Sequence, residues 1–329
     1  MRKQGLHRRC GAALLAFLLV MACFTVSVMA REDIDLDRSS SISVHFGSGS
    51  RDFSGVEFSL YRVASVSESG EYTLTGDFRS YNVSFEGLDS SDWRALAQTL
   101  DAYAARDELE PLREGETDSD GEVYFAGLRP GLYLVTGEQY SSGGTVYTPE
   151  PMLVSLPGEA DNGGWDYSVN VSCKYDYETT PEKLTQIRVQ KVWRDGGNES
   201  ARPRYIYVQL LENGRVVDTV ALSEDNDWEY TWEDLSASSK WQVVEDDVSD
   251  GYTVTVEREG RVFVITNTKP DDEPEPSESP APSKPPDEPE KLPQTGQLWW
   301  PVPLLICAGL ILVAAGLIIR RRRGGSDED

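Results

Sequence analysis

The sequence predicts an all-β fold with two tandem β-sandwich domains, the first carrying an inserted helix, followed by a proline-rich stalk and a C-terminal transmembrane helix. Between residues 31 and 268, apolar and polar residues alternate with a period of two, and turns rich in Gly, Asn, Asp and Ser separate the runs. Nine of the eighteen prolines fall between Pro270 and Pro293. The stretch Leu298–Ile319 is predominantly apolar and long enough to span a bilayer.

The chain is strongly acidic. It has 329 residues, with 56 acidic and 31 basic side chains and a formal net charge of −25. Without the two terminal segments, residues 31–295 hold 53 acidic and 23 basic side chains, a net charge of −30. Phosphate binding needs clustered Lys and Arg, so we expect no nucleic-acid partner.

Residues 1–30 have the pattern of a secretory signal peptide. Four basic residues in the first nine precede an apolar run from Ala12 to Val28, and Val28-Met29-Ala30 is a small-residue cleavage pattern. We therefore expect secretion with cleavage after Ala30. The alternatives are a retained membrane anchor and lipid attachment at Cys23, whose preceding residues only loosely resemble a lipobox.

The other end carries a second targeting signal, residues 292–329. Leu292-Pro293-Gln294-Thr295-Gly296 precedes the apolar span, and Arg320–Arg323 follows it. By physical criteria alone this is a single-pass anchor with a cytoplasmic Arg cluster. The order of LPXTG, span and basic tail resembles the sorting signal of Gram-positive surface proteins. That resemblance implies that a sortase cuts between Thr295 and Gly296. The Thr295 carboxyl is then joined to an amine of a peptidoglycan precursor or a pilin, which anchors the protein in the cell wall.

Residues 269–291 predict an extended linker, since prolines interleaved with Asp, Glu and Ser cannot bury a core. In polyproline geometry, at ~3.1 Å per residue, it reaches about 70 Å, enough for a stalk through the wall. Cys173 is the one cysteine outside the signal peptide and the apolar span, so the mature segment cannot form an intramolecular disulfide. A secreted protein without disulfides needs stability from another source.

The second domain, residues 181–268, shows seven short alternating runs, which indicate an antiparallel sandwich. They are Thr185–Trp193, Tyr205–Leu211, Val216–Leu222, Trp228–Trp232, Trp241–Glu245, Tyr252–Val256 and Arg261–Asn267. Side chains alternate between the faces of a strand, so residue parity predicts what points inward. By this criterion Lys191, Glu245 and Asn267 each lie on a strand face that is otherwise apolar.

These three residues predict a covalent cross-link. Desolvation favours a neutral, nucleophilic Lys191 amine and a protonated Glu245 carboxyl. The amine can attack the side-chain amide carbon of Asn267, while Glu245 hydrogen-bonds the developing oxyanion and shuttles a proton, and ammonia leaves. The product is an isopeptide bond between the first and last strands. The alternative is that each polar group extends from the strand end to solvent.

The same segment resembles the CnaB-type domain of Gram-positive adhesins and SpaA-type pilins. The resemblance covers nearly all of 185–268 and rests on these motifs: Lys191-Val192-Trp193-Arg194-Asp195, Arg202-Pro203, Val208-Gln209-Leu210, Asn213-Gly214, Trp228 and Ile265-Thr266-Asn267-Thr268. It implies an Ig-like sandwich in which Lys191 and Asn267 form the isopeptide bond and Glu245 catalyses its formation. One departure is Trp241, which occupies a position where the family usually has Tyr.

The first domain, residues 31–180, is less regular. Expected strands include Ser41–Phe46, Gly55–Tyr61 with Val56, Phe58 and Leu60 inward, Gly131–Val135 and Met152–Leu156. Helical spacing predicts a helix over Ser91–Arg106. Asp118–Gly121 is rich in carboxylates but lacks a twelve-residue calcium loop, so a β-turn is favoured and no metal is expected. Since Lys174 is the one Lys between Arg31 and Thr180, a second internal cross-link is not expected here.

Lys174 closes a run that resembles the pilin motif WxxxVxVYPK. Trp165, Val169, Val171 and Lys174 match the motif, whereas Ser172-Cys173 replaces Tyr-Pro. The resemblance implies that the Lys174 amine accepts the Thr carboxyl of the next subunit from a pilin sortase. The alternative is a Lys retained in a domain that no longer polymerises.

Together these features predict a structural surface protein, secreted and anchored to peptidoglycan, most simply a sortase-assembled pilin. The alternative is a monomeric wall-anchored adhesin that binds a host or cell-surface ligand. The expected partners are a sortase, a peptidoglycan precursor and other pilin subunits. We expect no cofactor and no enzymatic activity beyond autocatalytic cross-linking, because His45 is the one His outside the signal peptide and has no nucleophile–base arrangement around it.

Overall fold

The structure is a computed structural model that describes residues 32–49, 51–161, 163–179 and 184–269. The predicted signal peptide with Ala30, the stalk beyond Lys269, and the sorting signal with Leu292, Pro293, Thr295 and Gly296 lie outside these residues. Within the described ranges, none of the helices has the length and apolar character needed to cross a membrane.

The first region, residues 32–179, is built mainly of β-strands, with one α-helix. Its strands are β1 (Ser40–His45), β2 (Gly47–Ser48), β3 (Arg51–Asp52), β4 (Glu57–Val66), β5 (Tyr72–Leu74), β6 (Arg113–Glu116), β7 (Glu122–Leu128), β8 (Gly131–Gly137), β9 (Tyr140–Ser142), β10 (Thr145–Pro149), β11 (Met152–Leu156), β12 (Gly158–Glu159), β13 (Trp165–Asp166), β14 (Ser168–Ser172) and β15 (Tyr175–Thr179). The helices are α2 (Ser90–Arg106) and the short 3-10 helix η1 (Gly76–Ser80).

The strands of this region form three larger sheets. Their orders are β11-β8-β4-β5 with β6 also paired to β4, β14-β1-β7, and β15-β10-β9. Their core contains Phe46, Phe53 and Phe58, which are fully buried and pack with ring centroids 4.9–5.7 Å apart. The inward parity predicted for Val56, Phe58 and Leu60 is confirmed, since all three are buried.

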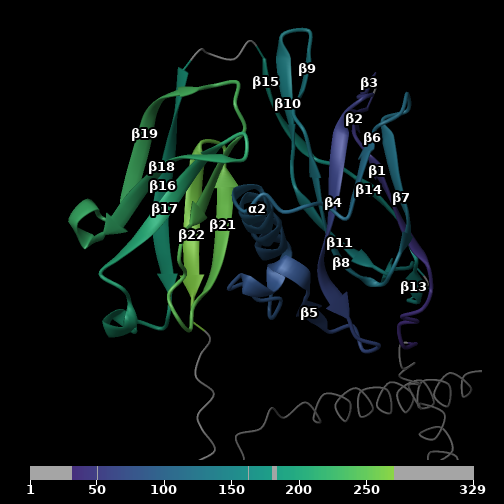
Figure 1. The fold of residues 1–329 in the computed structure, drawn as a ribbon, viewed down its shortest axis with the longest axis horizontal. Helices are drawn as coiled ribbons and strands as arrows, with labels where there is room; N and C mark the ends of the chain where they lie inside the picture. The colour runs from purple at the N-terminus through teal and green to yellow at the C-terminus, as the bar shows by residue number, and fades with distance from the viewer. Residues whose placement is uncertain (1–31, 50, 162, 180–183, 270–329) are drawn as a thin grey trace, which may run out of the picture. The chain divides into compact units, whose positions relative to one another are not determined.

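The second region, residues 184–269, is a two-sheet sandwich (Figure 1). Its strands are β16 (Leu184–Arg194), β17 (Tyr205–Glu212), β18 (Arg215–Ser223), β19 (Glu229–Ser236), β20 (Trp241–Glu245), β21 (Thr253–Glu259) and β22 (Val262–Thr268), with short helices η2 (Glu199–Ala201) and η3 (Glu224–Asn226). One sheet has the order β19-β16-β22-β21 and the other β18-β17-β20. All seven predicted strands are present, so the predicted all-β sandwich is confirmed.

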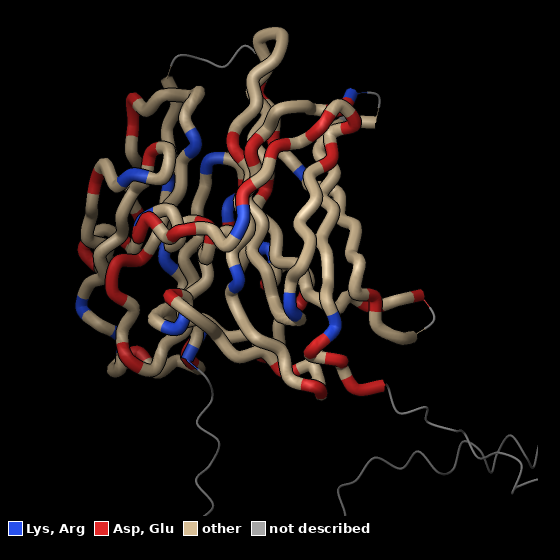
Figure 2. Tube along the Cα trace, turned by 45° about the vertical axis from the view of Figure 1, so that its right-hand side comes forward, with Lys and Arg blue, Asp and Glu red and all other residues tan. Residues whose placement is uncertain are grey.

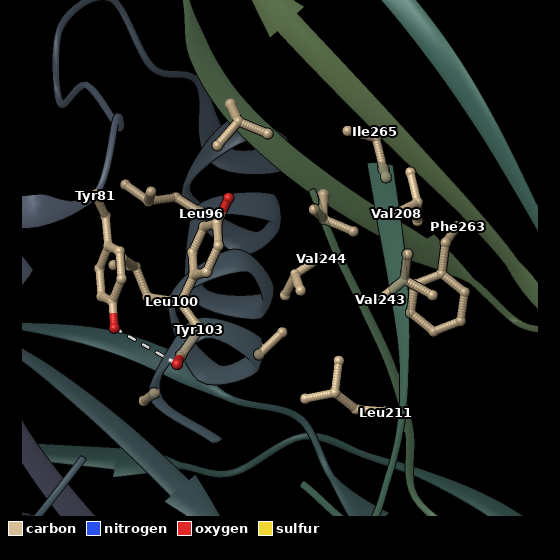
Figure 3. Packing of buried hydrophobic residues seen from close by; sticks show 14 of the residues in the cluster. Tyr81, Leu96, Leu100, Tyr103, Val208, Leu211, Val243, Val244, Phe263 and Ile265 are labelled. Carbon is tan, nitrogen blue, oxygen red and sulfur yellow. Dashed lines mark hydrogen bonds between the residues drawn. The ribbon is translucent and has the colours of Figure 1, made fainter. Parts of the chain in front are cut away.

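Helix α2 lies beside β21 of the second region (Figure 1). Asp89 begins the helix with a capping box, in which its carboxylate accepts from the backbone N–H groups of Ser91 and Asp92. Leu96, Leu100 and Tyr103 join Val208, Val243 and Ile265 of the second sandwich in one continuous apolar core (Figure 3). The helix is thus buried against both regions, which together form one compact unit.

Acidic residues are distributed along the chain in both regions rather than gathered at one place, with basic residues interspersed (Figure 2). Even distribution of one sign of charge keeps a surface hydrated and resists association. The described surface therefore presents its negative charge broadly, in keeping with the net charge of the sequence.

Candidate cross-linking site

Lys191, Glu245 and Asn267 come from three strands of the second sandwich. Lys191 lies in β16 and Asn267 in the neighbouring parallel strand β22, where Lys191 is opposite Ile265 and Asn267 is opposite Trp193. Glu245 ends β20 in the facing sheet. Residues two positions apart in register share a face, so the structure brings the three predicted side chains together between the sheets.

The Glu245 carboxyl lies between the other two groups. Asn267 Nδ2 donates to Glu245 Oε1 at 2.9 Å, and Lys191 Nζ lies 3.6 Å from Glu245 Oε2. The side chains of Lys191 and Glu245 are fully buried, and Asn267 is 0% exposed. Lys191 Nζ also donates to the carbonyl oxygen of Val192 at 3.3 Å. The alternative in which these head groups extend to solvent is therefore wrong.

Two acceptors in this pocket lack a hydrogen-bond donor. Within the described residues, Glu245 Oε2 and Asn267 Oδ1 are buried without one. A protonated Glu245 removes part of this deficit, because its O–H becomes a donor. If the Asn267 amide turns about its Cβ–Cγ bond, that O–H can point at Oδ1 and polarise the carbonyl.

Burial shifts both ionisable groups towards their neutral forms. Desolvation lowers the pKa of the Lys191 amine, which the nearby Glu245 carboxylate partly offsets. Desolvation raises the pKa of the Glu245 carboxyl, with Lys191 and Asn267 acting in the opposite direction. A neutral amine is a nucleophile and a protonated carboxyl is an acid, the two forms that amide attack requires.

An aromatic layer covers the Lys191 amine. Its Nζ lies 4.2 Å from the centre of the Trp193 ring, and Trp228 and Tyr252 pack edge-on against that ring with centroids 5.3 Å away. Asp195 holds Tyr252 of this layer in place, since its carboxylate accepts from Arg202 Nε at 2.7 Å and from the Tyr252 hydroxyl at 3.2 Å. The layer keeps water from the amine and so maintains its desolvation.

Asp195 and Arg202 belong to two of the motifs that resemble the CnaB-type domain, but the sequence pattern assigned a role to neither residue. Arg202 hydrogen bonding lowers the pKa of the Asp195 carboxyl well below its ordinary value of 3.8. The spacing of seven residues gave no hint of this contact, because the chain between them forms a turn and the helix η2. Asp195 and Arg202 therefore support the aromatic layer over Lys191, because Asp195 binds Tyr252 and Tyr252 packs on Trp193.

The arrangement can perform one reaction without any added group. A bond forms between Lys191 Nζ and Asn267 Cγ, the Cγ–Nδ2 bond breaks, and Glu245 passes the amine proton to the departing nitrogen, which leaves as ammonia. Glu245 contacts both reacting groups, so it is placed for this transfer. Holding the reacting groups in place in a dry pocket lowers the barrier of such a step.

Lys174 belongs to the first region and has a different environment from the buried Lys191. It is exposed between β14 and β15, and its carbonyl accepts from the backbone N–H of Glu150 at 2.8 Å. A cavity of about 300 Å³ lined by Trp93, Met152, Leu153 and Lys174 adjoins it. The neighbouring Cys173 is buried, and burial raises the pKa of its thiol to about 12, which leaves it unreactive.

The acidic segment Asp118–Gly121 forms a β-turn. Gly121 N donates to Asp118 O at 3.1 Å, and the Asp118 carboxylate accepts from the backbone N–H groups of Asp120 and Glu122. Across the described part of the chain, no cluster of three or more His, Cys, Asp or Glu residues could hold a metal ion.

The second region is similar to a known family of domains. Residues 187–268 match the family model of the Cna protein B-type domain, which confirms the resemblance expected for this segment. Domains of this type are structural modules rather than enzymes, in agreement with the sequence-based expectation. A curated relative, the collagen adhesin of Staphylococcus aureus, is 34% identical over 82 residues, which are 23% of this chain and 7% of the relative's length.

Solved structures show a similar but more distant likeness. A single B repeat unit of the collagen-binding surface protein of Staphylococcus aureus is 18% identical and covers 70% of this chain and 97% of its own, with a TM-score of 0.25. The full-length major pilin SpaD of Corynebacterium diphtheriae is 13% identical and covers 73% of this chain and 100% of its own, with a TM-score of 0.28.

Proposed function

We propose that this protein is a structural surface protein, anchored to peptidoglycan and stabilised by an isopeptide bond between Lys191 and Asn267. The observation that carries the proposal is the buried contact of Glu245 with both partners, at 2.9 Å to Asn267 Nδ2 and 3.6 Å to Lys191 Nζ. Burying charged groups is costly, and two acceptors of this cluster, Glu245 Oε2 and Asn267 Oδ1, have no hydrogen-bond donor among the described residues, so a reaction that turns Lys191 and Asn267 into one neutral amide lowers this cost.

The match of residues 187–268 to the Cna B-type domain supports this proposal independently. The signal-peptide pattern ending at Ala30 and the LPQTG sequence followed by an apolar span supply the route to the wall. In this scheme a sortase cleaves between Thr295 and Gly296 and joins Thr295 to a peptidoglycan precursor. The stalk then holds both sandwiches outside the membrane.

The isopeptide proposal is tested by intact mass. Residues 31–295 should weigh one ammonia, about 17 Da, less than the sequence mass, because the cross-link expels Asn267 Nδ2. Glu245→Ala should restore the full mass, whereas Glu233→Ala, a change at an exposed Glu of β19, should leave the mass loss intact. A wild-type chain at full sequence mass would contradict the proposal.

We further propose that the protein polymerises as a pilin, with the Lys174 amine as acceptor and the Thr295 carboxyl as donor. The exposure of Lys174 after β14 and the adjoining cavity support this role, because an intermolecular acceptor must be reached by an enzyme-bound acyl group. The second candidate is a monomeric adhesin that binds a host or cell-surface ligand. The partial match to a collagen adhesin supports this second candidate.

Denaturing gels of wall extracts separate these two functions. A pilin gives a ladder of high-mass species that Lys174→Ala abolishes and that Lys269→Ala, a change at the end of the second sandwich, preserves. A single band in the wild type favours the monomeric adhesin. A ladder that survives Lys174→Ala would show that another amine is the acceptor.

A further inference from the structure

Helix α2 of the first region contacts the residue that would catalyse cross-linking in the second. The Tyr103 hydroxyl donates to the backbone carbonyl oxygen of Glu245 at 3.0 Å, and Tyr103 is 3% exposed. Tyr81 stacks on the Tyr103 ring with a centroid separation of 4.7 Å and an interplanar angle of 12°. In Figure 3 the two rings lie at α2 on the left, and Val243 and Val244 of β20 lie to their right. The hydroxyl therefore has a fixed direction.

A second residue of α2 holds the other end of the same strand. The Asp101 carboxylate accepts from Gln242 Nε2 at 2.8 Å and pairs with Lys240 Nζ at 3.2 Å. Asp101 and Gln242 are each 6% exposed, and hydrogen bonds to a buried charged group are strong. Strand β20 is therefore tied to α2 at its first residues and at its last.

The first region also covers the free edge of β21. Val256 N donates to Thr99 Oγ1 at 2.7 Å, Arg258 N donates to Gln98 Oε1 at 2.8 Å, and Val254 N donates to Asn82 O at 2.8 Å. Strand β21 pairs with β22 on its other side, so these alternate N–H groups form its outer edge. An uncovered edge of this kind invites pairing with other chains.

We propose that α2 is a positioning element for cross-linking, with Tyr103 and Asp101 holding β20 so that the Glu245 carboxyl stays between Lys191 and Asn267. Bond formation in the second sandwich then depends on docking of the first. This inference rests on the proposed isopeptide function.

The position of Glu245 at a strand end makes its side chain sensitive to backbone motion. Glu245 is the last residue of β20, and beyond it the backbone N–H of Asp246 still donates to Tyr207 O at 3.0 Å. The side chain of a terminal strand residue moves with any fraying of the backbone, and a displacement of about 1 Å can slow a positioned reaction by about 100-fold. The Tyr103 hydroxyl restrains the carbonyl of this same residue.

The test follows cross-linking in freshly synthesised protein. Residues 31–295 are made by cell-free translation, and the fraction that has lost about 17 Da is measured over time and across pH, with near-UV circular dichroism recording the folded fraction. The variants are Tyr103→Phe and Asp101→Asn. The matched control is Tyr124→Phe, which removes the hydroxyl of a Tyr that is 66% exposed on β7.

We expect Tyr103→Phe and Asp101→Asn to slow bond formation in the folded protein by on the order of ten-fold, with the control at the wild-type rate. The pH at which the rate is greatest should not move, because Lys191 and Glu245 are unchanged. If both variants slow only in proportion to a smaller folded fraction, or match the wild type, the inference is overturned. If the wild type never loses ammonia, the proposed function itself fails.

Discussion

In both β-rich regions the first long strand pairs in parallel with a strand from the end of the region. In the first region β1 pairs with β14, with Ser41 opposite Ser168, and their hydroxyls lie 3.3 Å apart. In the second region β16 pairs with β22, and this pairing carries Lys191 and Asn267. Both regions therefore have the parallel strand pairing that a cross-link between first and last strands needs. Among the described residues, the Lys, Glu and Asn that could form it lie together in the second region.

The proposed cross-link therefore depends on three residues placed on a strand arrangement that both regions share. The first region instead closes its core with aromatic rings. Phe46, Phe53, Tyr147 and Tyr175 pack with centroid separations of 4.5–5.8 Å. Aromatic burial stabilises a core at the cost of side-chain ordering, whereas a covalent link lowers the entropy of the unfolded chain.

Removal of the Glu245 carboxyl should change the unfolding free energy more than the other substitutions, because it prevents the proposed cross-link that distinguishes the second region from the first. Glu245→Ala leaves Lys191 and Asn267 unlinked, and closure of a loop of roughly 75 residues is worth about 4–5 kcal/mol in the entropy model. We expect the second region to lose at least this much unfolding free energy in urea, with Glu233→Ala unchanged. A Glu245→Ala chain as stable as the wild type would remove the contrast between the regions.

The pH dependence of cross-linking tests the shifted ionisations. The reactive form of the pair holds one proton, on Glu245, with Lys191 neutral. On the acid side Lys191 becomes protonated and ceases to be a nucleophile, and on the alkaline side Glu245 loses its proton. The rate of ammonia loss should therefore rise and then fall with pH, by ten-fold or more on each side. A rate that only increases with pH would exclude Glu245 as an acid.

The contact between the regions can be weakened at one hydrogen bond. Thr99→Val keeps the side-chain shape but leaves the buried Val256 N–H without its acceptor, which costs about 1–3 kcal/mol. We expect faster hydrogen exchange at the Val256 amide and a lower unfolding free energy. Thr219→Val, at an exposed Thr of β18, serves as the control. Unchanged exchange at Val256 would mean that α2 does not protect the β21 edge in solution.

The smallest effect concerns the layer over Lys191. Asp195→Asn weakens the pair with Arg202 and should lower the unfolding free energy by about 1–2 kcal/mol at neutral pH. Since the folded-state pKa of Asp195 lies below 3.8, its contribution is full above that pH and is lost as the pH falls further. The stabilities of the wild type and the variant should therefore converge in acid, whereas the control Asp250→Asn, a change at an exposed Asp, should leave the unfolding free energy at neutral pH unchanged. A difference in unfolding free energy that persists at low pH would show that the shape of the side chain at position 195, and not its charge, causes the effect.

The second region was predictable because its strands follow period-two alternation, so residue parity alone placed Lys191, Glu245 and Asn267 inward. The register that brings them together follows from pairing of the first and last strands, which sequence alternation cannot give. The role of Asp195 was hidden for the same reason, since its partners Arg202 and Tyr252 are joined by a turn and by tertiary packing.

The burial of α2 was only partly predictable. Helical spacing predicted the helix itself, and its apolar residues Leu96, Leu100 and Tyr103 are buried. Thr99 and Asp101 are buried as well, although their polarity suggests a solvent face. Their partners Val256 and Gln242 lie about 140–160 residues further along the chain. A polar residue whose partner is that distant gives no local signal of burial.

Tandem mass spectrometry of a tryptic digest of residues 31–295 tests directly whether Lys191 is bonded to Asn267. Cleavage after Arg188, Arg194 and Arg261 releases Val189–Arg194 and a peptide that begins at Val262. We predict that the two are recovered as one branched species joined through Lys191 and Asn267 and about 17 Da lighter than their sum. Recovery of two separate peptides, with trypsin cleaving after Lys191, would show that Lys191 and Asn267 are not joined.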